Sequence, residues 1–228
     1  MLQQQLIEEV MMMTIVLAYI ILSLLMFAQL SRSYQLSTRL VSTASSSRSR
    51  AISSSLRSTS GLIQPGSLIP SAIVDVVESS DGVEYKMVSG VDFQAILVAH
   101  AKAVIFAVPG AFTPTCSEKH LPGFIANSDL IRSKGVDAIY CISVNDKYVM
   151  KSWGLSTTDF IKSGIKMVAD GNGDLAKAMG LAKDASGSRM GLRSTRFAAI
   201  VEQGVLKAIE VDEKGLDKSS AETILALL

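Results

Sequence analysis

The 228-residue chain is long enough for one medium-sized domain with an appended segment, and one domain is the simplest expectation. A net charge of +1 at pH 7 gives no argument for nucleic acid as a partner, and two cysteines exclude a disulfide framework, so a hydrophobic core must hold the fold. The charges are uneven, because the residues before Asp75 contain five Arg, no Lys and two acidic residues, against 17 Lys and Arg and 19 Asp and Glu from Asp75 onward.

The first sixty residues have the composition of targeting segments. Residues 10–28 are nineteen residues without a charge, which as a helix would extend about 28 Å, close to the hydrocarbon thickness of a bilayer. This fits a membrane anchor or the apolar region of a signal peptide, although Glu8 and Glu9 stand where a signal peptide is expected to be basic. Residues 31–60 contain thirteen serines, five arginines and no acidic residue, which is typical of an organellar transit peptide.

We therefore expect residues 1–62 to be a targeting segment that is disordered in its Ser/Arg-rich part, and residues 63–228 to be the folded domain. A signal peptide followed by a transit peptide suits a plastid, whereas translation from Met26 would leave a presequence similar to a mitochondrial one. A third reading is that residues 1–25 are never translated. The expected location is an organelle, mitochondrion or plastid, rather than the cytoplasm, and the mature domain is not expected to be membrane-bound.

From residue 72 onward the hydrophobic pattern predicts alternating strands and helices. The expected strands are 72–78, 83–88, 103–108, 137–144, 166–169, 196–202 and 205–211. The expected helices are a short one around 93–97, one from Cys116 to before Gly135, one closed by Gly154, 174–179, and one opened by a capping box at 219–222. This order predicts an α/β fold with a central mixed sheet covered by helices on both faces.

The chemistry of the chain centres on Cys116. The strand before it stops at Pro109, because proline has no N–H for a strand ladder, and the following turn delivers Cys116 to a helix N-terminus. Unpaired backbone N–H groups and the helix dipole favour thiolate over thiol there, so Cys116 is a candidate nucleophile; a buried structural cysteine is the alternative. His120 lies four residues on without a second ligand pair nearby, so we predict no metal site and give His120 a capping or packing role.

Pro109, Thr113 and Cys116 match the P-x-x-x-[ST]-x-x-C signature of peroxiredoxins, and the longer PGAFTPTCS resembles the type II, peroxiredoxin-5-like branch. The resemblance runs through the segments 119–124, 143–153 and 191–197 and covers roughly residues 64–228. It implies a thioredoxin-like fold and attack of a cysteine thiolate on a peroxide O–O bond, which gives a sulfenic acid. It implies no bound cofactor, since an external thiol supplies the reducing equivalents.

The same resemblance assigns the site residues. Cys116 supplies the peroxidatic sulfur, Thr113 a hydroxyl that hydrogen-bonds the peroxide, and Pro109 shields the thiolate from bulk water. Arg196, rather than Arg193, holds a positive charge against the sulfur and the peroxide oxygen.

Cys141 is a candidate resolving cysteine, because it follows Cys116 by 25 residues, as in plant-type members of the branch. Its predicted place in a buried strand argues against a disulfide. Cys141 is three residues short of Val144, which puts it about 10 Å below the sheet edge where Val108 ends, whereas a disulfide needs Cα atoms within about 7 Å. We expect no Cys116–Cys141 disulfide in the folded domain and resolution by glutathione with glutaredoxin, or by thioredoxin.

The predicted function is a thiol-dependent peroxidase that reduces hydrogen peroxide and alkyl hydroperoxides, with a role in antioxidant defence and redox homeostasis. The resemblance also implies a homodimer. One alternative is a dithiol oxidoreductase, which would need a C-x-x-C or C-x-x-S pair, whereas Lys119 occupies the third position after Cys116. Another is a redox-regulated binding module or holdase. Consumption of peroxide separates these hypotheses.

Overall fold

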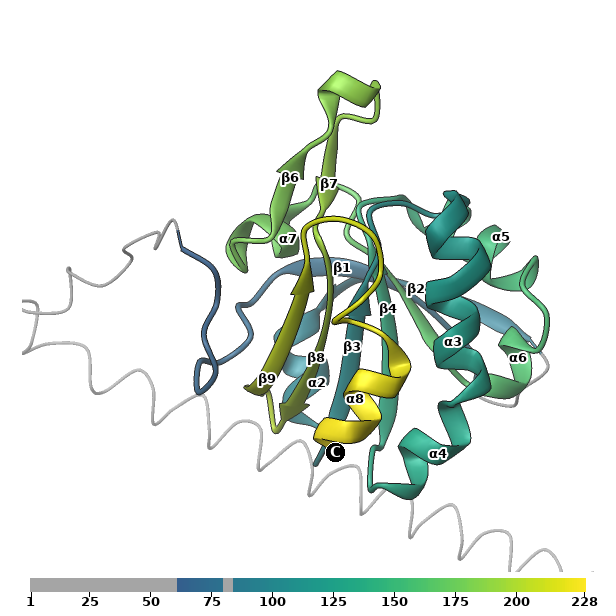
Figure 1. The fold of residues 1–228 in the computed structure, drawn as a ribbon, viewed down its shortest axis with the longest axis vertical. Helices are drawn as coiled ribbons and strands as arrows, with labels where there is room; N and C mark the ends of the chain where they lie inside the picture. Colours follow the sequence, from purple (N-terminus) through teal and green to yellow (C-terminus); the bar gives the residue numbers. More distant parts are fainter. Residues whose placement is uncertain (1–60, 80–83) are drawn as a thin grey trace, which may run out of the picture. The chain divides into compact units, whose positions relative to one another are not determined.

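The computed structural model describes residues 61–79 and 84–228, and a seven-stranded sheet in the order β2-β1-β5-β4-β3-β8-β9 forms their centre (Figure 1). The central strands β3, β4 and β5 run parallel, and the outer pairs are antiparallel. The strands of this sheet are β1 (Ile73–Ser79), β2 (Tyr85–Asp92), β3 (Ala103–Ala107), β4 (Ala138–Ser143), β5 (Lys166–Ala169), β8 (Arg196–Glu202) and β9 (Val205–Asp212). The prediction of a mixed sheet is therefore confirmed.

Helices cover both faces of the sheet and bury two hydrophobic clusters. The helices of one face are α3 (Leu121–Ala126), α4 (Ser128–Ser133), α5 (Lys147–Leu155), α6 (Phe160–Ser163) and α8 (Ala221–Leu227). The opposite face is covered by α2 (Phe93–Val98) and α7 (Asp174–Ala178). Every residue of β3 and β4 is buried, since these central strands have helices on both sides, which explains their unbroken apolar sequences.

Most predicted elements are present. Helix α6 was not predicted, and the single helix predicted from Cys116 to before Gly135 is divided into shorter segments, α3 and α4 among them. Three further differences concern α5, α8 and a hairpin. Helix α5 continues past Gly154, because this glycine is buried inside the helix, where the Phe160 ring packs on it. The N-cap of α8 is Ser220, whose hydroxyl accepts from the N–H of Thr223, so the capping position lies one residue later than the sequence pattern placed it.

The third difference is a two-stranded hairpin that was not predicted. It consists of β6 (Ala182–Asp184) and β7 (Leu192–Ser194), joined through the short 3₁₀ helix η2 (Ser186–Ser188), and it projects from the sheet (Figure 1). Strands of three residues are too short for a period-two pattern to stand out in the sequence.

The topology brings three chain segments to one edge of the sheet. β3 ends at Ala107, which lies beside Ile142 of the parallel strand β4 and beside Phe197 of the antiparallel strand β8. Because β8 runs in the opposite direction, its first residue, Arg196, lies at the edge where β3 ends. The loop that follows β3 and carries Cys116 is therefore built next to Arg196.

The segment that leads into β1 is tied to the domain by backbone hydrogen bonds. Ile63 N–H donates to Met179 O at 3.0 Å, Gly66 N–H to Leu206 O at 2.7 Å, and Ile69 is fully buried. Among residues 61–79 and 84–228, no helix is long and apolar enough to cross a membrane. Residues 1–60 of the predicted targeting segment, which include the apolar run 10–28, lie outside the described residues, as do residues 80–83 between the first two strands.

Candidate active site

Cys116 lies in the first turn of a helix that is locally widened. The first intrahelical hydrogen bond runs from Ser117 N–H to Thr113 O at 2.9 Å, so the amide of Cys116 precedes the ladder. Leu121 N–H then bonds to Cys116 O, five residues back, which makes Cys116–His120 a π-helical segment, η1. Such π-bulges occur frequently at functional sites. The predicted placement of Cys116 at a helix start is thus correct.

Arg196 is the charged group at the Cys116 sulfur. Its Nη2–H donates to Cys116 Sγ at 3.4 Å, and both residues are buried. A cation in hydrogen-bond contact with sulfur stabilises negative charge on that atom. Arg193, the other arginine of this stretch, points elsewhere and donates to Val144 O and Met190 O. The structure therefore brings Cys116 together with Arg196 and not with Arg193, as the family resemblance implied.

His120 holds Arg196 in place. Its Nδ1 lies 2.9 Å from Arg196 Nη1, which can only donate, so Nδ1 accepts and the ring proton sits on Nε2. This Nε2–H donates to Ser219 O at 2.8 Å. Burial, followed by the nearby Arg196 charge, lowers the pKa of His120 from 6.5 to about 4, so the imidazole is neutral. The rings of Phe106 and Phe124 pack around it.

Asp212 anchors the carbonyl that His120 binds. Its carboxylate accepts from Ser219 N–H at 2.9 Å and from the Ser219 hydroxyl at 2.7 Å, and also from the amides of Asp217 and Lys218. Burial alone would raise the pKa of Asp212, but these hydrogen bonds outweigh it and lower the pKa. A chain of contacts therefore runs from Asp212 through Ser219 and His120 to Arg196 and the sulfur.

The loop between β3 and η1 is held by short polar contacts. Thr113 Oγ1–H donates to Gly110 O at 2.9 Å, and Ala111 N–H donates to Asn145 Oδ1 at 3.0 Å. Gly110 is tightly enclosed, because a Cβ there would lie 3.2 Å from the Thr113 methyl carbon. Phe112 takes a positive φ of 60°, unusual for a bulky residue, and its ring is exposed.

Trp153 fixes the outer side of the cysteine helix. Its Nε1–H donates to Ser117 Oγ at 2.9 Å, which links α5 to η1. Pro109, in the loop between β3 and η1, lines a hollow of about 290 Å³ together with residues of the β6–β7 hairpin.

Cys141 lies within β4, fully buried, opposite Phe106 of β3 and Met167 of β5. It shares a hydrophobic cluster with Cys116 but is a free thiol, as is Cys116. Burial raises the pKa of Cys141, and the nearby Cys116 adds to this effect, which Arg196 only partly opposes. A thiol in this environment is a poor nucleophile.

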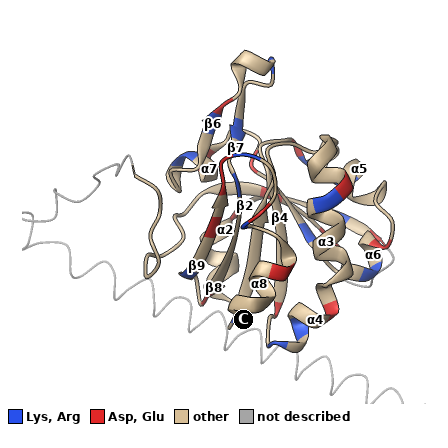
Figure 2. Cartoon of the chain, viewed as in Figure 1, with Lys and Arg blue, Asp and Glu red and all other residues tan. Residues whose placement is uncertain are grey.

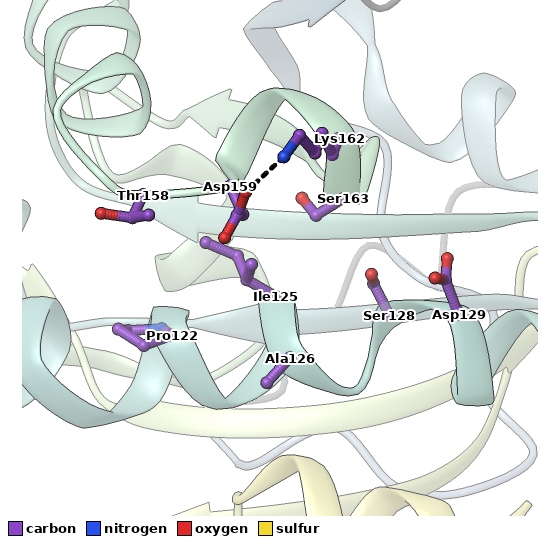
Figure 3. A pocket seen from close by; sticks show the side chains of 9 residues that line it. All are labelled: Pro122, Ile125, Ala126, Ser128, Asp129, Thr158, Asp159, Lys162 and Ser163. Atoms are coloured by element: carbon purple, nitrogen blue, oxygen red, sulfur yellow. Dashed lines mark hydrogen bonds and ion pairs between the residues drawn. The ribbon is translucent and has the colours of Figure 1, made fainter.

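A further hollow of about 410 Å³ lies between α3, α4 and α6 (Figure 3). Asp159 and Lys162 form an ion pair at its rim, with N and O 3.0 Å apart. Neither Cys116 nor Thr113 nor Arg196 lines it, so the largest of these hollows is separate from the reactive sulfur. Within the described part of the chain, no group of three His, Cys, Asp or Glu side chains is placed to hold a metal ion.

Four contributors to the site were not recognised in the sequence: His120, Asn145, Asp212 and Ser219. His120 was expected to cap or pack, and it does pack, but its contact with Arg196 spans 76 residues of sequence. The position of His120 one helical turn after Cys116 was a usable signal. Nothing local marks the site role of Asp212, or that of Ser219, which the sequence indicated only as part of a capping box, because that role depends on the return of the chain after β9.

The fold and the site together indicate a thiol redox protein, in which a buried cation, rather than a second cysteine of the same motif, lies beside the Cys116 sulfur. The comparisons with known proteins narrow this class. Residues 66–225 match the Redoxin family model. The chain is 44% identical over 173 residues to chloroplastic Peroxiredoxin-2E-2 of Oryza sativa subsp. japonica, covering 73% of this chain and 72% of that protein.

Two further relatives agree. Chloroplastic Peroxiredoxin-2E of Arabidopsis thaliana is 39% identical over 169 residues, covering 73% of this chain and 69% of that protein. The crystal structure of reduced Prx3 from Vibrio vulnificus in complex with hydrogen peroxide is 42% identical, covers 73% of this chain and 96% of that chain, and superposes with a TM-score of 0.62. The chain belongs to the peroxiredoxin family, in its type II branch, and has the thioredoxin-like fold expected of it.

Proposed function

We propose that this peroxiredoxin reduces hydrogen peroxide and alkyl hydroperoxides at Cys116 and is returned to the thiol by an external reductant. The observation that carries the proposal is the buried contact between Arg196 Nη2 and Cys116 Sγ at 3.4 Å. Among the described residues no carboxylate forms an ion pair with Arg196, so the Cys116 sulfur is the atom beside it that can carry negative charge in the proposed reaction.

In the reaction the thiolate sulfur attacks one peroxide oxygen and the O–O bond breaks. Sulfur loses two electrons and becomes a sulfenic acid, while the leaving oxygen takes up a proton and departs as water or an alcohol. Arg196, which already touches the sulfur, is placed to stabilise the charge that grows on the oxygens.

Thr113 and the backbone amide of Cys116 position the peroxide. The Thr113 hydroxyl donates its proton to Gly110 O, so its lone pairs face outward as acceptors for the O–H of a peroxide. The backbone amide of Cys116, which precedes the helical ladder, is a donor for the second oxygen. Pro109 bounds the loop and limits the access of water.

The sulfenic acid is resolved by an external thiol. Glutathione condenses with it to a mixed disulfide and releases water, and a second thiol, delivered by glutaredoxin or thioredoxin, restores Cys116 and carries away the disulfide. The burial of Cys141 and its raised pKa support this route. By resemblance to the family, the protein acts as a homodimer. The composition of residues 1–62 favours an organelle, and the two plant relatives, both named as chloroplastic, favour the plastid.

The test is peroxide consumption by the purified protein with dithiothreitol as reductant. Wild type is expected to turn over and to show a sulfenic acid at Cys116 by dimedone trapping when the reductant is withheld. Cys116→Ser is expected to lose both signals, while Cys141→Ala keeps the dimedone adduct. Turnover by Cys116→Ser would show that the nucleophile is assigned wrongly, and absence of turnover in wild type would favour a redox-regulated binding module.

A further inference from the structure

The hollow beside Pro109 is walled by the β6–β7 hairpin, which projects from the sheet and carries basic residues (Figures 1 and 2). Met190 and Arg193 close it against the cysteine loop, since a Cβ on Gly110 would lie 3.5 Å from Met190 Cε and 3.6 Å from Arg193 Nη1. A ligand in this hollow would lie next to the loop that carries Thr113 and Cys116.

Two cations of this wall are direct neighbours. Lys183 of β6 is the register partner of Arg193 of β7, and both line the hollow. Partners in an antiparallel pair share a face of the sheet, and like charges placed opposite each other destabilise it. The facing of Lys183 and Arg193 therefore lowers the stability of the hairpin unless an anion lies between the two side chains.

No carboxylate of the described chain neutralises this pair. Lys183 Nζ donates to the main-chain oxygen of Glu213 at 3.3 Å, and Arg193 donates to the main-chain oxygens of Met190 and Val144. Asp184 also lines the hollow, but its carboxylate accepts from the N–H of Ser186 in the adjoining turn. The two Arg193 contacts hold the guanidinium at the loop, with one terminal nitrogen left over for a ligand.

We propose that Lys183 and Arg193 form a subsite for a carboxylate on a ligand that reacts at Cys116. The carboxylate belongs either to the hydroperoxide substrate, as in a hydroperoxy acid, or to glutathione as the reductant. The hollow of about 290 Å³ has room for the body of such a molecule, with apolar contacts from Pro109 and Met190. This inference rests on the peroxidase function proposed above and names two residues that set its specificity.

The substrate arm of the test uses two peroxides that differ in one group, cumene hydroperoxide and its para-carboxylate derivative, with dithiothreitol as reductant. The measured quantity is the ratio of kcat/KM for the charged peroxide to that for the neutral one, in full-length protein. Lys183→Gln is expected to lower this ratio about threefold and Lys183→Glu more, and added salt should reduce the difference. Lys86→Gln, an exposed lysine on the distant edge strand β2, is the matched control and should leave the ratio unchanged.

The reductant arm compares glutathione with its diethyl ester, using hydrogen peroxide as the oxidant. The measured quantity in this arm is the ratio of kcat/KM for glutathione to that for its diethyl ester. If Lys183→Gln lowers only this ratio, the subsite binds the carboxylate of glutathione. If it lowers only the peroxide ratio of the first arm, the subsite binds the carboxylate of the substrate. If Lys183→Gln and Lys183→Glu match Lys86→Gln in both arms, the subsite does not exist. Turnover of hydrogen peroxide with dithiothreitol is measured in parallel, because its absence would overturn the peroxidase function and not the subsite alone.

Discussion

Arg196 shows how one residue can set the chemistry of a site. Its guanidinium is buried and satisfies its hydrogen bonds with Cys116 Sγ and with the neutral ring of His120. Burying a cation is costly unless it is paired and hydrogen-bonded. The contacts with Cys116 Sγ and His120 Nδ1 supply such hydrogen bonds, and the thiolate of the proposed reaction would supply the opposite charge.

Removal of single donors and acceptors should slow peroxide reduction without unfolding the domain. We expect Arg196→Ala to lower the second-order rate constant for hydrogen peroxide on the order of a hundredfold, the typical effect of losing one preorganised donor. Thr113→Val, which keeps the shape but loses the hydroxyl, should have an effect of similar size. Stopped-flow tryptophan fluorescence measures the rate, and unchanged circular dichroism confirms the fold. A loss smaller than threefold in both variants would contradict the assigned roles.

His120 should make the stability of the protein sensitive to acid. Its pKa is about 4 in the folded domain against 6.5 for the free side chain, so below pH 6.5 the unfolded chain binds a proton that the native state refuses. Stability is therefore full above pH 6.5 and falls as the pH drops toward 4, by about 3 kcal/mol in total. Urea unfolding between pH 4 and 7 measures this slope.

The matching variant is His120→Gln, whose amide can still donate to Ser219 O but does not titrate. Its stability should vary less steeply with pH than that of wild type. The lowered pKa of His100, due first to burial and then to Lys166, and the lowered pKa of Asp212 contribute to the slope that remains. The pKa of Asp170, raised by burial, opposes them. Equal slopes in the two proteins would show that His120 is not the group responsible. His120→Asn, which keeps an acceptor for Arg196, should retain more peroxidase activity than His120→Gln, because the acceptor holds the guanidinium.

At the scale of elements, two helical glycines have opposite expected effects. A Cβ on Gly154 in α5 would lie 2.6 Å from Phe160 Cε1, whereas a Cβ on Gly123 in α3 meets no atom within 4 Å. Gly154→Ala should therefore destabilise the protein by about 1–3 kcal/mol through overpacking. Gly123→Ala should stabilise it by about 0.5–1 kcal/mol, because alanine loses less backbone entropy in a helix. Equilibrium unfolding measures the change in the free energy of unfolding of each variant. Changes of the same sign in the two variants would contradict the prediction.

The position of Cys141 within β4 leads to a prediction about turnover. Since its strand is paired on both sides with β3 and β5, bringing Cys141 to the sulfenic acid would require part of the sheet to open. We expect Cys141→Ala to retain most of its turnover with glutathione and glutaredoxin, and peroxide-treated wild type to contain no Cys116–Cys141 disulfide by mass spectrometry. Loss of most activity in the variant together with accumulation of that disulfide would show that Cys141 resolves the intermediate.

At the scale of the whole molecule, the domain is completed by a segment that precedes its first strand. Ile63 and Gly66 bond to residues near the other end of the chain, and a Cβ on Gly180 would lie 2.4 Å from Gly61 O. Removing these residues would expose buried surface and unpaired backbone groups. Proteolytic maturation that leaves the domain intact should thus spare this segment.

We expect the mature protein to begin between Arg39 and Gln64, and within this interval before Ile63. The upstream residues have the composition of a targeting segment, and the contacts of Ile63 set the downstream limit. Mass spectrometry of the protein from its native source measures the terminus, and a fluorescent fusion of residues 1–62 reports the organelle. An intact N-terminus that includes residues 10–28 would indicate a membrane anchor.

Local sequence determined most of the fold. The largely apolar runs of β3 and β4 and the Gln203-Gly204 turn between β8 and β9 are produced by neighbouring residues, so pattern rules find them. The same holds for Cys116, because its helix start is encoded within ten residues. The motif with Pro109 and Thr113, and the likeness of 191–197 to the family, supplied the remaining candidates.

Only the tertiary structure decided what holds the reactive group. The contact of Arg196 with Cys116 spans 80 residues, and the contact of His120 with Ser219, which Asp212 anchors, spans 99. These contacts depend on β8 running antiparallel beside β3 and on the loop after β9 returning over the site. The facing of Lys183 and Arg193 likewise follows from a hairpin with three-residue strands. The hydrophobic pattern of an element predicts which of its faces is buried. It does not predict which side chains of distant elements meet there, because that depends on strand order and register.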